Sequence, residues 1–255
     1  MPRRLVLLLA AFASLAIVAC NSAPAAPALT DPKEILTKTV TSLTNVKTIH
    51  LTGTFGGSVA AGSMGNFDLS SVKLDASADV AGKKVRLNLD APTLLGTAVD
   101  VIAVDNSAYL KIVGPLAAMA GANASGKYTK MDAGSGDVPQ EATDPAKAIA
   151  ELEQELAKLP KPPQKLADEK CGDTDCYHVQ LALSADELAA VSGGSADAAG
   201  SVTLDVLTRK NDLRPARIAF TFDGGTSGTV TGTFELTYDQ AVNISAPPAD
   251  QIAGG

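Results

Sequence analysis

The sequence has little of several residue types on which common protein chemistries depend. Among its 255 residues there is no tryptophan, aromatic side chains make up 4%, and there are two histidines and three cysteines. So few imidazole and thiol groups leave little material for a metal site or for several imidazole-dependent steps. Basic side chains, 21 against 28 acidic ones, give no general attraction to nucleic-acid phosphates. We therefore expect no metal, no other cofactor and no nucleic-acid partner.

Small and aliphatic residues dominate instead. Hydrophobic residues make up 45% of the chain, which is enough to offset the entropy of ordering it, so the composition argues against intrinsic disorder. The length is that of one or two globular domains. An acidic protein of this kind must cover a large aliphatic surface with few aromatic side chains.

The first 20 residues carry an export signal. Arg3 and Arg4 precede an apolar run from Leu5 to Val18, which is shorter than the about 20 residues that a membrane-spanning helix needs. The run ends in Ile17-Val18-Ala19-Cys20, which resembles the lipobox of bacterial lipoproteins. That resemblance implies cleavage before Cys20, a thioether-linked diacylglycerol on Cys20 and usually an amide-linked acyl chain such as palmitate. The alternative is an ordinary secretory peptide with a chance cysteine near its end.

Such an anchor would hold the protein at a membrane. Each buried methylene contributes about 0.8 kcal/mol, so two or three acyl chains suffice. Loss of residues 1–19 leaves 19 basic against 28 acidic side chains, which offers no attraction to anionic headgroups. We expect a signal peptide at 1–19, a lipidated cysteine with a flexible Pro/Ala-rich tether at 20–30, and a single lipid-binding domain at 31–255. The domain would lie on the extracytoplasmic side of the cell membrane.

The other two cysteines lie close together. Cys171 and Cys176 are separated by Gly-Asp-Thr-Asp, a sequence that favours a turn. In an exported chain this arrangement predicts a disulfide that closes a short loop. A redox or metal pair is the alternative, but the spacing is not Cys-x-x-Cys and only His178 stands nearby as a further ligand.

Three segments begin with residues that cap helices. Asp31-Pro32 and Asp144-Pro145 each place an acidic N-cap before a proline at the first helical position, and Ser184 forms a capping box with Glu187. Apolar residues then recur at helical spacing, which predicts a helix after each cap. The apolar face predicted for the second helix is Ile149, Leu152, Leu156 and Leu159.

Most of the remaining chain alternates apolar and polar residues with period two, as strands with one buried face do. Short turns join these segments, which predicts antiparallel neighbours, since parallel strands need long crossovers. Phe67 and Leu69 differ in parity from Val72 and Leu74, so a β-bulge is expected near Ser70. The expected α+β fold is one antiparallel sheet of roughly ten strands that curls around two principal helices.

The order of these signals is similar to that of the LppX/LprG-type lipoproteins of mycobacteria. A lipobox precedes the capped helix start at 31–36, which runs into the segment 46–53, and later come the segments 102–111, 127–132 and 246–252. The resemblance covers most of residues 31–252. It implies a curved antiparallel half-barrel sheet wrapped around helices, as in lipoprotein carriers of the LolA/LolB type. It also implies an apolar cavity between sheet and helices that holds the acyl chains of complex lipids or glycolipids.

The sequence offers no arrangement typical of an enzyme. The nearest approach to a Gly-x-Ser-x-Gly nucleophile turn surrounds Ser63 and lacks the first glycine. His50 and His178 both fall on the polar parity of their strands, with no nucleophile at a recognisable spacing. We expect both to be solvated or locally hydrogen-bonded strand histidines, and the protein not to be an enzyme.

The resulting hypothesis is a membrane-anchored carrier that binds acyl lipids or glycolipids and carries or presents them across the cell envelope. A transporter of the envelope is the protein partner expected for such a carrier. The alternative is a structural or interaction lipoprotein with a filled core, accessory to an envelope complex. Alternation shows where a side chain points and not what touches it, so the sequence leaves both open. The residues predicted to line the cavity are Leu51, Phe55, Leu87, Leu89, Val99, Val101, Phe220 and Phe222.

Overall fold

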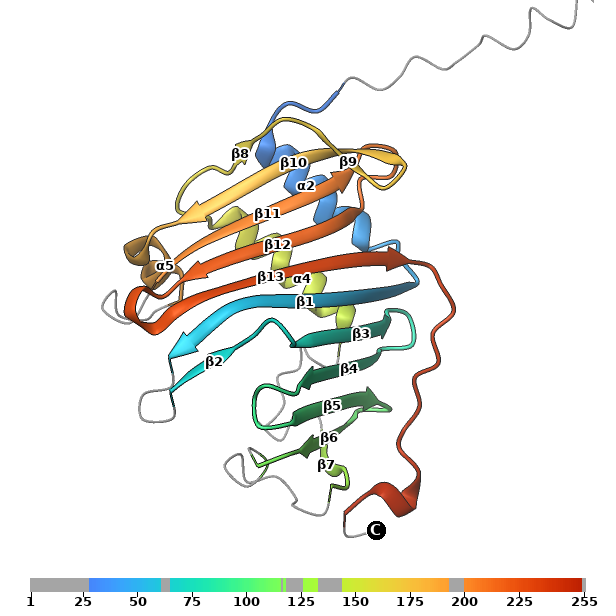
Figure 1. The fold of residues 1–255 in the computed structure, drawn as a ribbon. Coiled ribbons are helices and arrows are strands. Elements are labelled where there is room, and N and C mark those ends of the chain that lie inside the picture. Colours follow the sequence, from blue (N-terminus) through green and yellow to red (C-terminus); the bar gives the residue numbers. More distant parts are fainter. Residues whose placement is uncertain are drawn as a thin grey trace, which may run out of the picture.

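The computed structural model describes residues 28–60, 65–115, 117, 126–132, 144–192 and 200–253. These residues form one large antiparallel sheet with helices on one of its faces (Figure 1). The strands are β1 (Thr48–Ala60), β2 (Asn66–Asp68), β3 (Lys73–Asp79), β4 (Lys84–Ala91), β5 (Thr97–Val104), β6 (Ser107–Val113), β7 (Thr129–Asp132), β8 (Gln164–Lys165), β9 (Glu169–Cys171), β10 (Thr174–Leu183), β11 (Ser201–Arg209), β12 (Pro215–Asp223) and β13 (Gly228–Tyr238).

The strand order places the first strand of the sheet next to the last one. It runs β7-β6-β5-β4-β3-β1-β13-β12-β11-β10-β8, with β2 added to β1 and β9 added to β10. The first strand, β1, pairs with the last, β13, from Ile49 opposite Tyr238 to Val59 opposite Gly228. The remaining strands follow one another in chain order on either side of this central pair, so the sheet is a meander joined at its middle.

The α+β class and the antiparallel sheet agree with the sequence-based prediction, but the number of strands does not. The described residues form 13 strands, not roughly ten. The three that the sequence did not reveal are β7, β8 and β9, which contain four, two and three residues. Alternation cannot be recognised over so few residues.

The predicted bulge lies between β2 and β3. Both strands pair with β1, with Ser58 opposite Asp68 and Thr54 opposite Lys73. These pairs differ by one residue in register, because four residues of β1 correspond to five of the partner segment. Because of this extra residue, Phe67 and Val72 project from the same face of the sheet, although one has an odd and the other an even position in the sequence.

Three described helices are α2 (Pro32–Leu43), α4 (Pro145–Ala157) and α5 (Ala185–Ser192). The predicted caps are confirmed. The Asp31 carboxylate accepts a hydrogen bond from the backbone N–H of Lys33 at 2.8 Å, and the Asp144 carboxylate accepts one from that of Lys147 at 3.3 Å. At α5, Ser184 Oγ accepts from the Glu187 N–H at 3.4 Å while the Glu187 carboxylate accepts from the Ser184 N–H at 2.8 Å.

The apolar face of α4 is narrower than predicted. Ile149 is buried and Leu156 half-buried, but Leu152 is 46% exposed. Residues seven apart lie almost in line along a helix, whereas a residue three positions on is rotated by about 60°. Helix α4 therefore packs with the Ile149–Leu156 stripe and turns Leu152 to solvent. It also ends at Ala157, so the predicted Leu159 lies beyond it.

The two long helices lie side by side on one face of the sheet (Figure 1). Ile35 and Leu36 of α2 pack against Tyr177 and Val179 of β10 and against Val206 of β11. Further along, Val40 and Leu43 of α2 pack with Ile149 of α4, and Ile49 and Tyr238 border this cluster. We call the face of the sheet that carries Val179 and Val206 the helix face.

A third apolar cluster lies on the other face. Ile102, Val104 and Tyr109 pack there with Tyr128 and with Ile244 of the segment that follows β13. This C-terminal segment runs past β3 to β6 and reaches β7 (Figure 1). It is fixed at its end because the Tyr128 N–H donates to Gln251 O and the Ala253 N–H donates to Tyr128 O, both at 2.8 Å.

Candidate functional site: the helix face of the sheet

Strand register identifies which side chains share the helix face. Residues directly opposite one another on antiparallel strands project from the same face. The face therefore extends from Val179 on β10 as far as Ile112 on β6. The residues that connect them, each opposite the next, are Val179, Val206, Ile218, Phe234, Gly53, Leu74, Leu89, Val99 and Ile112.

All eight residues predicted to line a cavity lie on this face. Leu87 and Leu89 on β4 stand opposite Val101 and Val99 on β5. Ala76 on β3 connects Leu87 to Leu51 on β1. Gly232 on β13 stands between Phe55 on β1 and Phe220 on β12, and Phe222 follows two residues later on the same strand. The structure thus brings these residues onto one continuous apolar surface that crosses the middle of the sheet.

This surface is less buried than the part under α2. Val179 is 1% exposed and Val206 is 8% exposed, whereas each of the eight predicted residues is half-buried. Helix α2 packs against β10 and β11, near one end of the strand order. The helix face is consequently a packed core on β10 and β11 and a partly exposed apolar surface from β12 to β5.

Several residues of this surface were not among those predicted. Leu74, Ala76, Val85, Leu110, Phe234 and Leu236 occupy the same face by register and are also half-buried. The alternation of apolar and polar residues within each strand assigns them to the apolar face just as it assigns the predicted residues. What the sequence did not reveal is which strands lie next to each other, and so which side chains form one surface.

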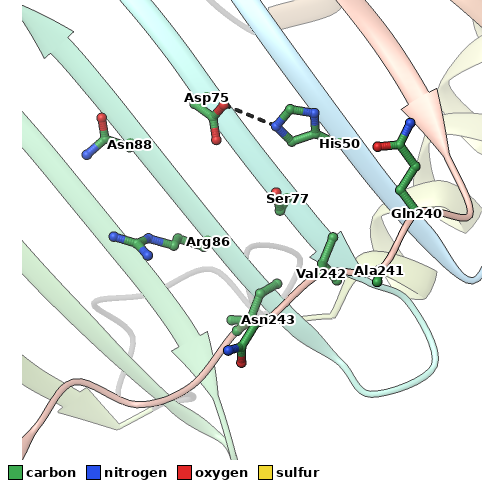
Figure 2. A pocket seen from close by; sticks show the side chains of 10 residues that line it. His50, Asp75, Ser77, Arg86, Asn88, Gln240, Ala241, Val242 and Asn243 are labelled. Atoms are coloured by element: carbon green, nitrogen blue, oxygen red, sulfur yellow. Dashed lines mark hydrogen bonds and ion pairs between the residues drawn. The ribbon is translucent and has the colours of Figure 1, made fainter.

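The opposite face is polar between β1 and β4. A groove of about 520 Å³ lies there between the strands and the C-terminal segment (Figure 2). His50 Nε2 lies 3.1 Å from Asp75 Oδ2 on its wall. The prediction of a locally hydrogen-bonded strand histidine is confirmed at this position. The groove is lined by His50, Asp75, Ser77, Arg86, Asn88 and the residues from Gln240 to Ile244.

Asp100 links Arg86 in this groove to Tyr128, whose backbone is hydrogen-bonded to the C-terminal segment. It accepts hydrogen bonds from Arg86 Nη2 at 2.9 Å and from the Tyr128 hydroxyl at 2.8 Å. Burial, together with the hydrogen bond to the Asp100 carboxylate, raises the pKa of Tyr128 to about 12. Tyr128 therefore stays protonated and donates throughout the neutral range, which fits a fastening role for this contact better than proton transfer.

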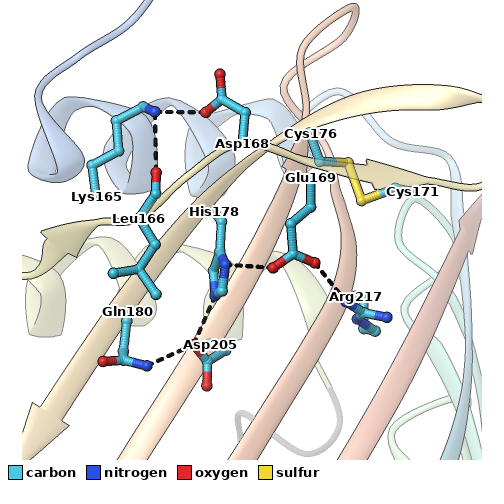
Figure 3. A network of polar contacts seen from close by, with 10 residues as sticks. All are labelled: Lys165, Leu166, Asp168, Glu169, Cys171, Cys176, His178, Gln180, Asp205 and Arg217. Carbon is cyan, nitrogen blue, oxygen red and sulfur yellow. Dashed lines mark hydrogen bonds and ion pairs between the residues drawn. A yellow bond between two sulfur atoms is a disulfide. The ribbon is translucent and has the colours of Figure 1, made fainter.

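His178 lies on the polar face of β10 between two carboxylates (Figure 3). Its Nδ1 is 2.8 Å from Glu169 Oε1 and its Nε2 is 2.7 Å from Asp205 Oδ1. Arg217 pairs with Glu169 at 3.3 Å, and Gln180 donates to Asp205 at 3.0 Å. Both ring nitrogens are thus engaged by acidic groups, and the prediction of a locally hydrogen-bonded histidine is confirmed here too.

The predicted disulfide is present. It joins Cys171 at the end of β9 to Cys176 on β10, with their Cα atoms 5.9 Å apart, and Cys176 is fully buried. Together with the Glu169–His178 contact it fastens β9 to the sheet beside it. Across the described part of the chain, no three His, Cys, Asp or Glu residues are grouped so that they could hold a metal ion.

Two sequence predictions fall outside the described residues. Cys20, with the rest of the predicted signal and most of the tether, precedes residue 28, and Ser63 lies between the described ranges. Among the helices that the structure does describe, none is both long enough and apolar enough to cross a membrane.

No model of a protein family matches the chain, and no curated protein matches it in sequence. Solved structures similar to it include the lipoprotein LppX of Mycobacterium tuberculosis, at 12% identity and a TM-score of 0.49, covering 84% of this chain and 98% of LppX. LprF of Mycobacterium bovis matches at 13% identity and a TM-score of 0.49, covering 85% of this chain and 96% of LprF.

A LolA-superfamily protein of Nitrosomonas europaea is also similar, at 8% identity and a TM-score of 0.31, covering 84% of this chain and 96% of that protein. The lipoprotein LppX and a LolA-superfamily protein, the two kinds of protein expected from the order of the sequence signals, are both among the structures similar to this chain.

Proposed function

We propose that this protein binds the acyl chains of lipids or glycolipids in an apolar cavity on the helix face, between the curved sheet and its helices, and carries or presents them across the cell envelope. The observation that carries the proposal is the half-buried apolar surface from β12 to β5, beside a packed core on the same face.

Contact with water makes such a surface unfavourable by about 25 cal/mol for each Å² that a ligand could cover. Monomeric soluble proteins rarely expose contiguous apolar surfaces of large size, and those that do commonly bind a partner or a ligand there. A flexible acyl chain matches the chemistry of the surface, because its side chains are aliphatic or phenyl groups.

Small residues leave room for such a chain. Ala76 and Ala78 occupy the helix face on β3, opposite Leu51 and Ile49 of β1. In a packed core, the volume above them would be filled by larger side chains from the layer on top. Here their larger neighbours on the same face, such as Leu51 and Leu87, remain half-buried.

We further propose that residues 1–19 are removed and that lipidated Cys20 anchors the protein on the extracytoplasmic side of the cell membrane. The first described contact of the chain supports an anchor close to β10, since the Leu29 N–H donates to the Tyr177 hydroxyl at 3.1 Å. An extended tether from Cys20 to Leu29 spans at most about 30 Å, at roughly 3.4 Å per residue. The end of the sheet near Tyr177 would then face the membrane, and a transporter of the envelope would be the partner that supplies or receives lipid.

The experiment is a blocking substitution on the helix face. Ala76 lies at the centre of the surface, between Leu51 and Leu87, and Ala76→Trp places a large side chain there. Thr52→Trp is the matched control, because Thr52 is exposed on the opposite face of the adjacent strand. Both are made in the full chain carrying Cys20→Ala, so that no covalent lipid contributes to the signal.

The measured quantity is the uptake of dansylamino-undecanoic acid after delipidation. We expect uptake by the parent chain and by Thr52→Trp, and loss of uptake by about tenfold or more in Ala76→Trp. Absence of uptake in the parent chain would contradict the carrier function and favour the accessory lipoprotein with a filled core.

A further inference from the structure

Three of the six phenylalanines meet at the middle of the helix face. The ring centroids of Phe220 and Phe234 are 5.9 Å apart and the rings are stacked at 22°. Phe55 is close to perpendicular to both, at 81° to Phe234 and 73° to Phe220, with centroid distances of 5.8 and 6.4 Å. All three are half-buried, so the cluster is part of the partly exposed surface and not of the packed core.

Each stacked ring lies over a glycine of the neighbouring strand. Phe234 stands opposite Gly53, and Phe220 stands opposite Gly232. A Cβ atom added to Gly232 would lie 2.1 Å from Cε1 of Phe220, and one added to Gly53 would lie 2.7 Å from Cδ1 of Phe234. The two rings therefore occupy the space that a side chain at the glycine position would take.

Backbone conformation does not explain these two glycines. Neither Gly53 nor Gly232 is among the glycines with a positive φ, so other residues could adopt their conformation. Glycine in the interior of a strand is unfavourable by about 0.5–1 kcal/mol relative to alanine. Contact with an aromatic ring of the neighbouring strand therefore explains why glycine occupies both positions. Side chains on a strand usually stand away from the sheet, whereas these rings lean onto it.

We propose that Phe55, Phe220 and Phe234 form the floor on which an acyl chain of the ligand lies, and that Gly53 and Gly232 determine how bulky a ligand is accepted. By giving the rings space against the sheet, the glycines keep the volume above the sheet open. This inference rests on the proposed lipid-binding function and assigns its ligand-contacting floor and its specificity-determining residues.

Gly232→Ala tests the inference. The added methyl group meets the far edge of a flexible side chain, so Phe220 must move off the sheet into the space above it. In the full chain carrying Cys20→Ala, we expect dansylamino-undecanoic acid to bind about tenfold more weakly than to the parent. The double variant Gly232→Ala/Phe220→Ala should bind more tightly than Gly232→Ala, because the displaced ring no longer fills the space above the sheet, but more weakly than the parent, because the floor has lost one ring.

Gly56→Ala is the matched control. It adds the same methyl group to β1 on the opposite face, where the nearest atom is Thr231 Oγ1 at 2.8 Å. We expect binding equal to that of the parent. Parent-like binding by Gly232→Ala would overturn the inference while leaving the lipid-binding function intact, whereas failure of the parent itself to bind would refute the function.

Phe220→Ala keeps the inference testable if Gly232→Ala does not fold. Loss of the ring enlarges the space over Gly232, so the lipids that copurify with this variant should have longer or bulkier acyl portions than those of the parent. An unchanged lipid mass distribution, measured by native mass spectrometry, would contradict the role of Phe220 as floor.

Discussion

The division of one sheet face into a packed part and an open part can be tested with two identical substitutions. Val179 and Val101 both lie on the helix face, on β10 and β5. Val179 is 1% exposed and packs against Ile35 and Leu36 of α2, whereas Val101 is half-buried between Leu87 and Leu110. Replacing each by alanine removes the same two methyl groups from two different surroundings.

The expected losses of stability differ because only one site leaves a cavity. At Val179 the lost transfer energy is about 1.6 kcal/mol, at about 0.8 kcal/mol per carbon, and the cavity term raises the total to about 2–3 kcal/mol. At Val101 part of the side chain already contacts solvent in the lipid-free protein. We expect Val101→Ala to lower the free energy of unfolding by less than about 1 kcal/mol.

Urea unfolding of the delipidated chain carrying Cys20→Ala measures both values. Added fatty acid should then narrow the difference between the two variants, since a ligand that is present at about 100 times its Kd stabilises the folded chain by about 2.7 kcal/mol. Val101→Ala should lose about 1 kcal/mol of this ligand-dependent gain, and Val179→Ala should keep all of it. Equal destabilisation by both substitutions, with equal ligand effects, would show that the helix face is one packed core.

Two further predictions concern the frame of the site. The hydrogen bond from Lys83 Nζ lowers the pKa of Asp144 in the folded chain, so the folded state resists protonation of this carboxylate. The contribution of the Asp144 carboxylate to stability is present above its unfolded-state pKa of about 3.9 and is lost as the pH falls through the lower folded-state pKa. The Asp144→Asn variant lacks this carboxylate, so its unfolding free energy should fall less than that of the parent below pH ~4. Acid titrations followed by circular dichroism measure the difference. Replacing both Cys171 and Cys176 by serine should lower the free energy of unfolding by about 2 kcal/mol, near the lower end for disulfides because the loop is short. Reduction of the parent chain should give a comparable shift in the urea midpoint. An unchanged midpoint would show that the disulfide does not stabilise the fold.

Local chemistry made part of this fold predictable. Asp31, Asp144 and Ser184 cap helices through bonds to amides two or three residues away, and these bonds depend on nothing distant in the chain. The period of a strand likewise fixes the face of each side chain, so Leu87 and Val101 could be assigned to a buried face before their pairing was known.

Features that depend on contacts distant in sequence were not predictable. The pairing of β1 with β13 places Gly53 beneath Phe234, and no pattern in the sequence of either strand predicts this pairing. The covering of Ile102 and Tyr109 by Ile244 is of the same kind, because the C-terminal segment reaches β7 without regular structure over most of its length. The eight predicted cavity residues could thus be named one by one, while the surface that they form together could not.

Native mass spectrometry of the full chain carrying Cys20→Ala, purified from a bacterial envelope without added lipid, tests lipid binding most directly. We predict a fraction of protein with a noncovalent adduct that has the mass of an acyl lipid or glycolipid and is absent from the Ala76→Trp variant. A single peak at the mass of the protein alone, or an adduct that Ala76→Trp retains in full, would contradict binding on the helix face.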